Sequence, residues 1–254
     1  MIKSYFLLLI IFFYSTLAET RNTGETEITT EEGIEVFQNE KYYLLKKNVE
    51  IISDELELKA DNVKIYFNKD LYDIEELIAN NKVNFNSKKF GVEGKGENLK
   101  FNIKNQKIFL NGINSKLFFK NIKMISDKEI IVDNLKGEFL INGPNSKLIS
   151  DQINISGEKI DGIFEIIEGE RNISNLNVED NKIIEIKTDD ILMFAKIAIF
   201  NSEKSIIELF NNVEIHRGNQ IITGDYGILD TNNNAYKVSS NKSNKVKALI
   251  GTNE

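Results

Sequence analysis

The amino-acid sequence predicts an all-β protein, and three observations support this fold class. Apolar residues recur at every second position in short runs, for example over residues 56–67, 99–103 and 246–250, which is the period of a strand with one buried face. The apolar residues of these runs are mostly Ile, Val, Phe, Tyr and Leu, which suit a pleated, half-buried surface. Polar clusters such as Asn80-Asn81-Lys82 separate the runs and are typical of turns.

The beginning of the chain has the composition of a secretory signal. Lys3 precedes an uninterrupted apolar run over residues 5–14, and small residues end the segment at Ala18. We expect residues 1–18 to be a cleaved signal peptide that exports the protein to the periplasm. A retained membrane anchor is the alternative, but the run is shorter than the roughly 20 apolar residues that a spanning helix needs.

The rest of the chain divides by composition. Residues 19–33 are polar and acidic, and we expect a flexible leader there. The alternating pattern continues from residue 34 to residue 250, which we assign to one β domain, and residues 251–254 form a short tail.

Charge and residue usage exclude several classes of function. The formal net charge is −7, and Lys and Arg are scattered singly, which argues against a nucleic-acid partner. The chain has no cysteine and a single histidine, His216, so common nucleophilic triads and multi-histidine metal sites lack their residues. We expect no enzymatic activity, no catalytic residues, no metal site and no cofactor.

A degenerate repeat runs through the chain. Asn48-Val49-Glu50-Ile51 returns as Asn212-Val213-Glu214-Ile215, and twelve positions after each valine an aspartate follows a small residue, as Ala60-Asp61 and Gly224-Asp225. A small residue permits a tight change of chain direction, and the aspartate can accept hydrogen bonds from nearby backbone amides. We therefore expect strand-turn repeats with structural aspartates.

These motifs resemble the OstA-like repeats of periplasmic lipopolysaccharide-transport proteins. The matching stretches are residues 34–110 and 184–230, whereas residues 111–181 match only in strand rhythm, which leaves room for a separate lobe. The resemblance implies a twisted, partly open, V-shaped antiparallel β-jellyroll that holds lipid A acyl chains between two sheets. It also implies a bridge that works with inner-membrane and outer-membrane components; the A component fits better than the membrane-anchored C component or the periplasmic domain of the D component.

In such a fold, inward-facing apolar residues would line the slot for the lipid tails, although the same alternation is equally expected of a closed core. The expected tail-slot residues are Leu56, Leu58, Ile65, Phe67, Leu99, Phe101, Phe139, Phe194 and Ile215.

Unprotected edge strands would also allow head-to-tail self-association. The candidate edges are residues 34–45 and 235–250. Two other functions fit parts of the composition: an Asn-rich β-solenoid adhesin of the cell surface, and a β-helix glycan hydrolase or lyase that uses paired carboxylates.

Overall fold

The computed structural model describes residues 21–69, 73–151, 153–188, 190–241 and 244–251, and the regular structure in these ranges is entirely β-strand. The all-β prediction is therefore confirmed. No helix long and apolar enough to cross a membrane occurs within these ranges, and the expected signal peptide lies outside them.

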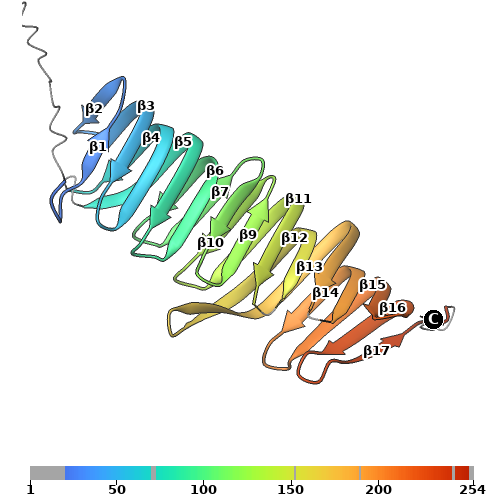
Figure 1. Ribbon diagram of the computed structural model, residues 1–254. Helices are drawn as coiled ribbons and strands as arrows, with labels where there is room; N and C mark the ends of the chain where they lie inside the picture. Colours follow the sequence, from blue (N-terminus) through green and yellow to red (C-terminus); the bar gives the residue numbers. More distant parts are fainter. Residues whose placement is uncertain (1–20, 70–72, 152, 189, 242–243, 252–254) are drawn as a thin grey trace, which may run out of the picture.

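In the described part of the chain, eighteen strands follow one another along an elongated molecule (Figure 1). The first nine are β1 Glu27–Thr29, β2 Gly33–Phe37, β3 Tyr42–Ile52, β4 Leu56–Phe67, β5 Ile74–Ser87, β6 Val92–Asn102, β7 Lys107–Asn111, β8 Ser115–Phe118 and β9 Ile122–Ser126. The others are β10 Glu129–Asp133, β11 Glu138–Ser150, β12 Asn154–Ile167, β13 Glu170–Lys187, β14 Ile191–Asn201, β15 Ile206–Arg217, β16 Gln220–Asp230, β17 Ala235–Ser239 and β18 Lys247–Ile250.

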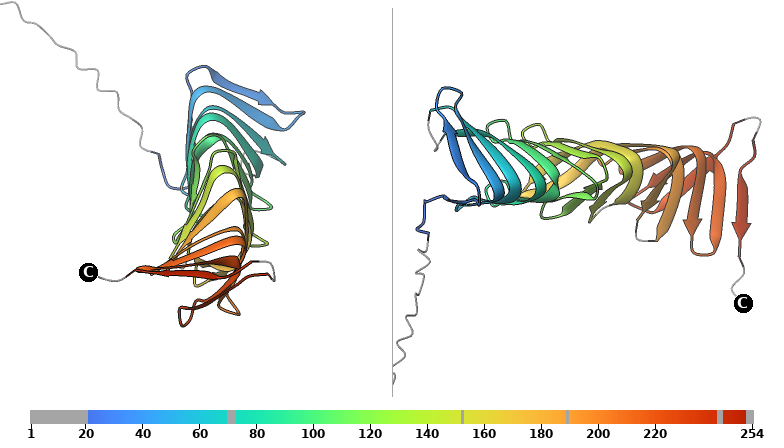
Figure 2. Two further views of the ribbon diagram at one scale, coloured as in Figure 1. Left: turned by 90° about the vertical axis from the view of Figure 1, so that its right-hand side faces the viewer. Right: turned by 90° about the horizontal axis from the view of Figure 1, so that it is seen from above.

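Each long strand changes direction near its middle and thereby belongs to two half-sheets that face each other. In β3, for example, residues 42–46 pair with residues 62–66 of β4, and residues 49–52 pair with residues 57–60 after a shift of register. Half-sheet 1 contains the segments that pair like residues 42–46 of β3, and it extends from β2 to β17. Half-sheet 2 contains the segments that pair like residues 49–52 of β3, and it extends from β1 to β18. Seen along the long axis, the two half-sheets form a V (Figure 2). All the strand pairs among the described residues are antiparallel, as the resemblance implied.

The repeated motif lies where the strands bend. Asn48, Asn81 and Asn212 have φ of 49°, 62° and 56°, in the left-handed region that Asn adopts more readily than most other residues. The valine after Asn212 then pairs with Gly224 of the next strand. A Cβ atom at Gly224 would lie 2.5 Å from Cγ1 of Val238, so the small residue of the motif is required by close packing inside the bend.

The repeat aspartates tie neighbouring bends together. Asp127, which follows the small residue Ser126 in the same pattern, accepts hydrogen bonds from the backbone N–H of Asn114 at 2.9 Å and from Nδ2 of Asn145 at 2.7 Å. These bonds lower the pKa of its carboxyl group. Asp225 likewise accepts a hydrogen bond from the backbone N–H of Asn241 at 2.9 Å. These contacts support the structural role that the sequence predicted for the aspartates.

Two regions differ from, or add to, the organisation expected from the sequence. Part of the expected flexible leader is ordered as the strand β1, which pairs with residues 50–52 of β3. This strand forms because Ile28 alternates with polar neighbours and packs against the core. Residues 111–181 continue both half-sheets through β8 to β13 without a break in pairing.

Candidate functional site

The interior of the V, between the half-sheets, is a continuous apolar core, and most of the predicted tail-slot residues face it. They are buried there at Leu58, Ile65, Phe67, Leu99, Phe101, Phe139 and Ile215, and Leu56 is partly buried against the same core. The alternation of each strand places these side chains inward and leaves their neighbours, such as Glu57, on the outer face.

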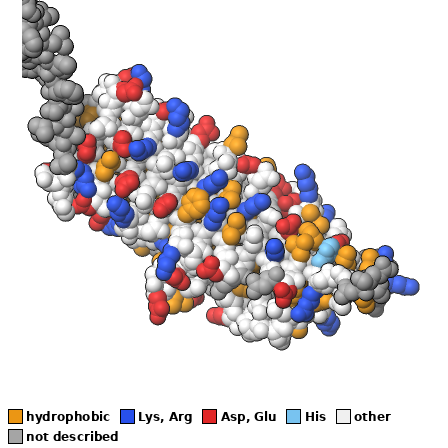
Figure 3. Space-filling view, in the orientation of Figure 1, with side chains coloured by type: hydrophobic (Ala, Val, Ile, Leu, Met, Phe, Trp, Pro, Cys, Tyr) orange, Lys and Arg blue, Asp and Glu red, His pale blue; other side chains and the backbone are white. Residues whose placement is uncertain are grey.

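The inward orientation expected of Phe194 was wrong. Met193 and Ala195 are buried on either side of it, so Phe194 lies on the outer face of half-sheet 2. Its ring makes an edge-on contact with His216 at a centroid distance of 5.4 Å, and His216 bonds to the carboxylate of Glu214. Figure 3 shows this histidine beside hydrophobic side chains on a surface otherwise rich in charge.

Side chains fill the interior in this structure. Apolar residues from both half-sheets are almost completely inaccessible to solvent from Leu45 near one end to Leu229 near the other. Acyl chains would therefore enter only if the half-sheets separate.

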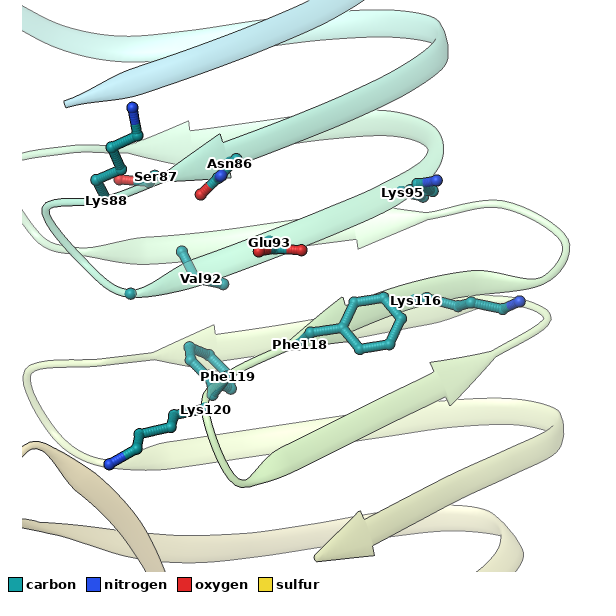
Figure 4. Close-up of a pocket in the computed structure, with 11 residues that line it drawn as sticks. Asn86, Ser87, Lys88, Val92, Glu93, Lys95, Lys116, Phe118, Phe119 and Lys120 are labelled. Carbon is teal, nitrogen blue, oxygen red and sulfur yellow. The ribbon is translucent and has the colours of Figure 1, made fainter. Parts of the chain in front are cut away.

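An open cleft of about 660 Å³ lies at β6 and β8, where Lys95 and Lys116 occupy directly opposite positions (Figure 4). Phe118 and Phe119 also line this cleft.

On the side of the V opposite the bends, turns connect successive strands within each half-sheet, and we call this side the mouth. Turns such as residues 88–91 and 119–121 belong to half-sheet 2, and turns such as residues 103–106 and 134–137 belong to half-sheet 1. Because the strands cross from one half-sheet to the other at the bends and not at the mouth, the mouth is the side on which the half-sheets can separate.

One hairpin extends beyond its neighbours and covers the middle of the mouth. Pairing of β12 with β11 ends at Ile163, and pairing of β13 with β14 ends at Asn175, but β12 and β13 continue to pair with each other as far as residues 167 and 170. We call residues 163–175 the arm. It is the hairpin that projects from the body in Figure 1.

Aromatic rings hold the arm against the interior. Phe164 is buried and packs on Phe139 and Phe119, with centroid distances of 6.1 and 6.3 Å. Its backbone N–H donates a 2.8 Å hydrogen bond to the carbonyl of Gly137 in the neighbouring turn. Phe139, predicted for the tail slot, therefore lies directly beneath the arm.

Arg171 joins the arm to both half-sheets. Its Nη2 donates to Oδ1 of Asn134 at 2.7 Å in a half-sheet 1 turn, and to the carbonyl of Phe90 at 3.1 Å in a half-sheet 2 turn. The guanidinium also lies 3.9 Å above the ring of Phe119. The backbone of Arg171 exchanges two hydrogen bonds with the side chain of Asn121.

The electrostatics of Arg171 are unusual for a cation. Only 6% of the residue is exposed, and within the described residues no carboxylate forms an ion pair with it. Burial lowers the pKa of the guanidinium to about 10, so it remains charged at neutral pH. A buried charge without a counter-ion is costly, which singles out this position.

No group of three or more acidic or histidine side chains able to hold a metal occurs in the described part of the chain.

Arg171 and the arm were missed from the sequence. The run Glu170-Arg171-Asn172 resembles a polar turn, but Arg171 is two positions from the buried Ile173 and so shares its inward phase. A charged residue in phase with buried apolar neighbours is the signal that could have identified it.

Two family models match separate parts of the chain. Residues 28–138 match the model described as LptA/(LptD N-terminal domain) LPS transport protein, and residues 159–251 match the model described as OstA-like protein. Together they extend over most of the sequence, including part of the region 111–181 that resembled the repeats only in rhythm.

Among solved structures, the fold is similar to that of LptH from Pseudomonas aeruginosa, described as the LptA homologous periplasmic component of the lipopolysaccharide transport device. The match has a TM-score of 0.42 and 9% sequence identity, and covers 52% of this chain and 95% of that chain. No curated protein sequence matches the chain.

Proposed function

Because the chain belongs to the OstA-like family of lipopolysaccharide-transport proteins, we propose that it is a periplasmic bridge protein that binds lipid. In this proposal it accepts lipopolysaccharide from an inner-membrane component and passes it towards an outer-membrane component. The acyl chains lie between the two half-sheets, and the protein itself carries out no chemical reaction.

The observation that supports this proposal is the continuous apolar interior, which is joined on one side only. Every long strand connects the half-sheets at a bend, whereas the mouth is closed by side-chain contacts and turns. Transfer of a methylene group out of water contributes about 0.8 kcal/mol, so a twelve-carbon chain provides roughly 9 kcal/mol to offset the opening of the mouth.

Site-specific photo-crosslinking tests the proposal. A benzophenone amino acid at Phe67, which faces the interior, should capture lipopolysaccharide in cells. The same group at Tyr66, the adjacent residue on the outer face, is the matched control. Equal capture at both positions, in variants with unchanged circular dichroism, would reject an internal lipid site.

The two ends of the molecule provide the surfaces for the bridge partners. Among the described residues, β1 and β2 pair only with β3 at one end, and β17 and β18 pair only with β16 at the other, so each end presents edge strands from both half-sheets. We propose that these edges dock the membrane components or another copy head to tail. Deletion of residues 235–254 should remove the ladder of crosslinked oligomers, and an unchanged ladder would contradict this docking mode.

The expected export is tested independently of lipid. N-terminal sequencing of the protein from the producing cell should give a mature chain that begins at Glu19. A chain that retains Met1 would favour the membrane-anchored C component of the same system.

A further inference from the structure

We propose that Arg171 binds the phosphate group of a phosphorylated amphiphile whose acyl chains enter the interior beneath the arm. This inference rests on the proposed function, because it assigns the headgroup of the lipid whose tails that function places between the half-sheets.

The first argument is the absence of a counter-ion at a buried cation. The groups that accept hydrogen bonds from the guanidinium are neutral: the amide oxygen of Asn134 and the carbonyl of Phe90. The carboxylate beside it in sequence, Glu170, pairs with Lys120 instead, at 2.6 Å. Within the described residues the position therefore holds a positive charge that no protein group neutralises.

The second argument is the unused donor capacity of the guanidinium. Nε and Nη2 donate hydrogen bonds, but Nη1 makes none in the described part of the chain. Nη1 is also not among the buried atoms without a partner, so it keeps some contact with solvent. A guanidinium binds phosphate oxygens through parallel N–H donors, and Nη1 offers the first of these without any rearrangement.

The third argument is the position of Arg171 between water and the apolar interior. The rings of Phe119 and Phe164 lie on its inner side, with Arg171 Cζ 3.9 and 5.6 Å from their centroids, and Phe139 packs beneath them. An amphiphile with its tails among these rings would place its headgroup at the level of the guanidinium.

The same contacts explain how binding and opening would be coupled. Separation of the half-sheets breaks the bond from Arg171 to Phe90 and exposes the guanidinium, and a phosphate then replaces a neutral acceptor with a charged one. Charge-assisted hydrogen bonds are roughly twice as strong as neutral ones, so the anion stabilises the open form.

A pair of lipids with identical tails tests the inference. Binding of didecanoyl phosphatidic acid and of didecanoylglycerol is measured by intrinsic tyrosine fluorescence or calorimetry on the mature chain. The wild-type protein should prefer the phosphorylated lipid by about tenfold. Arg171→Gln should lose this preference and still bind didecanoylglycerol, whereas Arg171→Lys should retain most of it.

Arg217→Gln is the matched control, because Arg217 also reaches across the mouth, to the carbonyl of Asn234 at 3.2 Å, but is exposed. It should leave the preference unchanged. Inorganic phosphate at the concentration of the lipid should not displace phosphatidic acid; displacement would assign the site to free phosphate and overturn the amphiphile.

The outcomes separate this inference from the proposed function. If the wild-type protein binds neither lipid, the proposed function fails and the inference fails with it. If both lipids bind and Arg171→Gln keeps the full preference, or Arg217→Gln loses it equally, only the role of Arg171 is overturned. Thermal melting of each variant shows whether a loss of binding reflects loss of the fold.

Discussion

The mouth is closed in two different ways along the molecule. In the middle, polar contacts cross from one half-sheet to the other, through Arg171, through Asn121 and through the ion pair of Lys120 with Glu170. Near the N-terminal end, at the turns 38–41, 53–55 and the described parts of 68–73, no hydrogen bond or ion pair joins the half-sheets. There the ring contact of Tyr43 with Phe67, at 5.0 Å, lies within half-sheet 1.

This difference indicates where the opening of the mouth costs the least free energy. Apolar contacts alone can part gradually and admit an acyl chain, whereas the middle must break directional bonds to a buried charge. We expect the N-terminal part of the mouth to open at a lower free-energy cost than the middle. Each of the following substitutions removes a contact that closes the middle and should reduce this difference.

Phe164→Ala should have the largest effect. Loss of the ring that packs on Phe139 and Phe119 removes the apolar contact of the arm and should lower the free energy of unfolding by about 3–5 kcal/mol. In hydrogen-exchange experiments, the backbone amides of the turns 119–121 and 134–137 should then be no better protected than those of the N-terminal turns. Ile166→Ala, on the exposed face of the same hairpin, should change stability by less than about 0.5 kcal/mol.

Gly137→Ala should displace the arm through the backbone. Its Cβ atom would lie 2.2 Å from the carbonyl oxygen of Phe164, at a φ of 71°, so we expect a loss of about 2–4 kcal/mol from left-handed strain and overpacking. Gly169→Ala has a similar φ of 80° but nothing within 4 Å, and should cost only the strain. Urea denaturation of the two variants separates the terms, and equal losses would mean that the clash relaxes.

Asn134→Ala removes the principal acceptor of the guanidinium. Because it leaves a buried charge with fewer hydrogen bonds, we expect a loss of about 1.5–3 kcal/mol. The control is Asn98→Ala, whose side chain donates to Oδ1 of Asn111 at 2.9 Å on an exposed face, and which should cost less than about 0.5 kcal/mol. Similar losses in denaturant unfolding would show that Arg171 does not depend on this contact.

Lys120→Ala should have the smallest effect. The side chains of Lys120 and Glu170 are 72% and 41% exposed, and exposed ion pairs contribute under about 1 kcal/mol and weaken with salt. The difference in thermal stability from wild type should disappear at high ionic strength. A loss that persists in salt would instead indicate packing of the lysine stem against the mouth.

The sequence was informative where local pattern controls structure and less so where long-range contacts do. Alternation correctly placed Leu58, Ile65 and Phe101 inside. The polar cluster Asn80-Asn81-Lys82, which was expected to be a turn between strands, instead lies at the bend within β5. Phe194 was misplaced because Leu192, Met193, Phe194 and Ala195 are all apolar, so alternation has no phase there. The closure of the mouth by Arg171 joins residues 37 and 81 positions apart, and short-range patterning carries no information about such pairs.

The bends have a further consequence for how the interior opens. Each strand is shared by both half-sheets and is hydrogen-bonded to the next strand on both sides of its bend. The strands β3, β5, β11 and β15 have an asparagine with positive φ at the bend. If one of them pivoted there, the ladder would carry the adjacent strands in the same direction. The interior would therefore widen progressively along the molecule, with the strands on either side of an opened section already rotated outward.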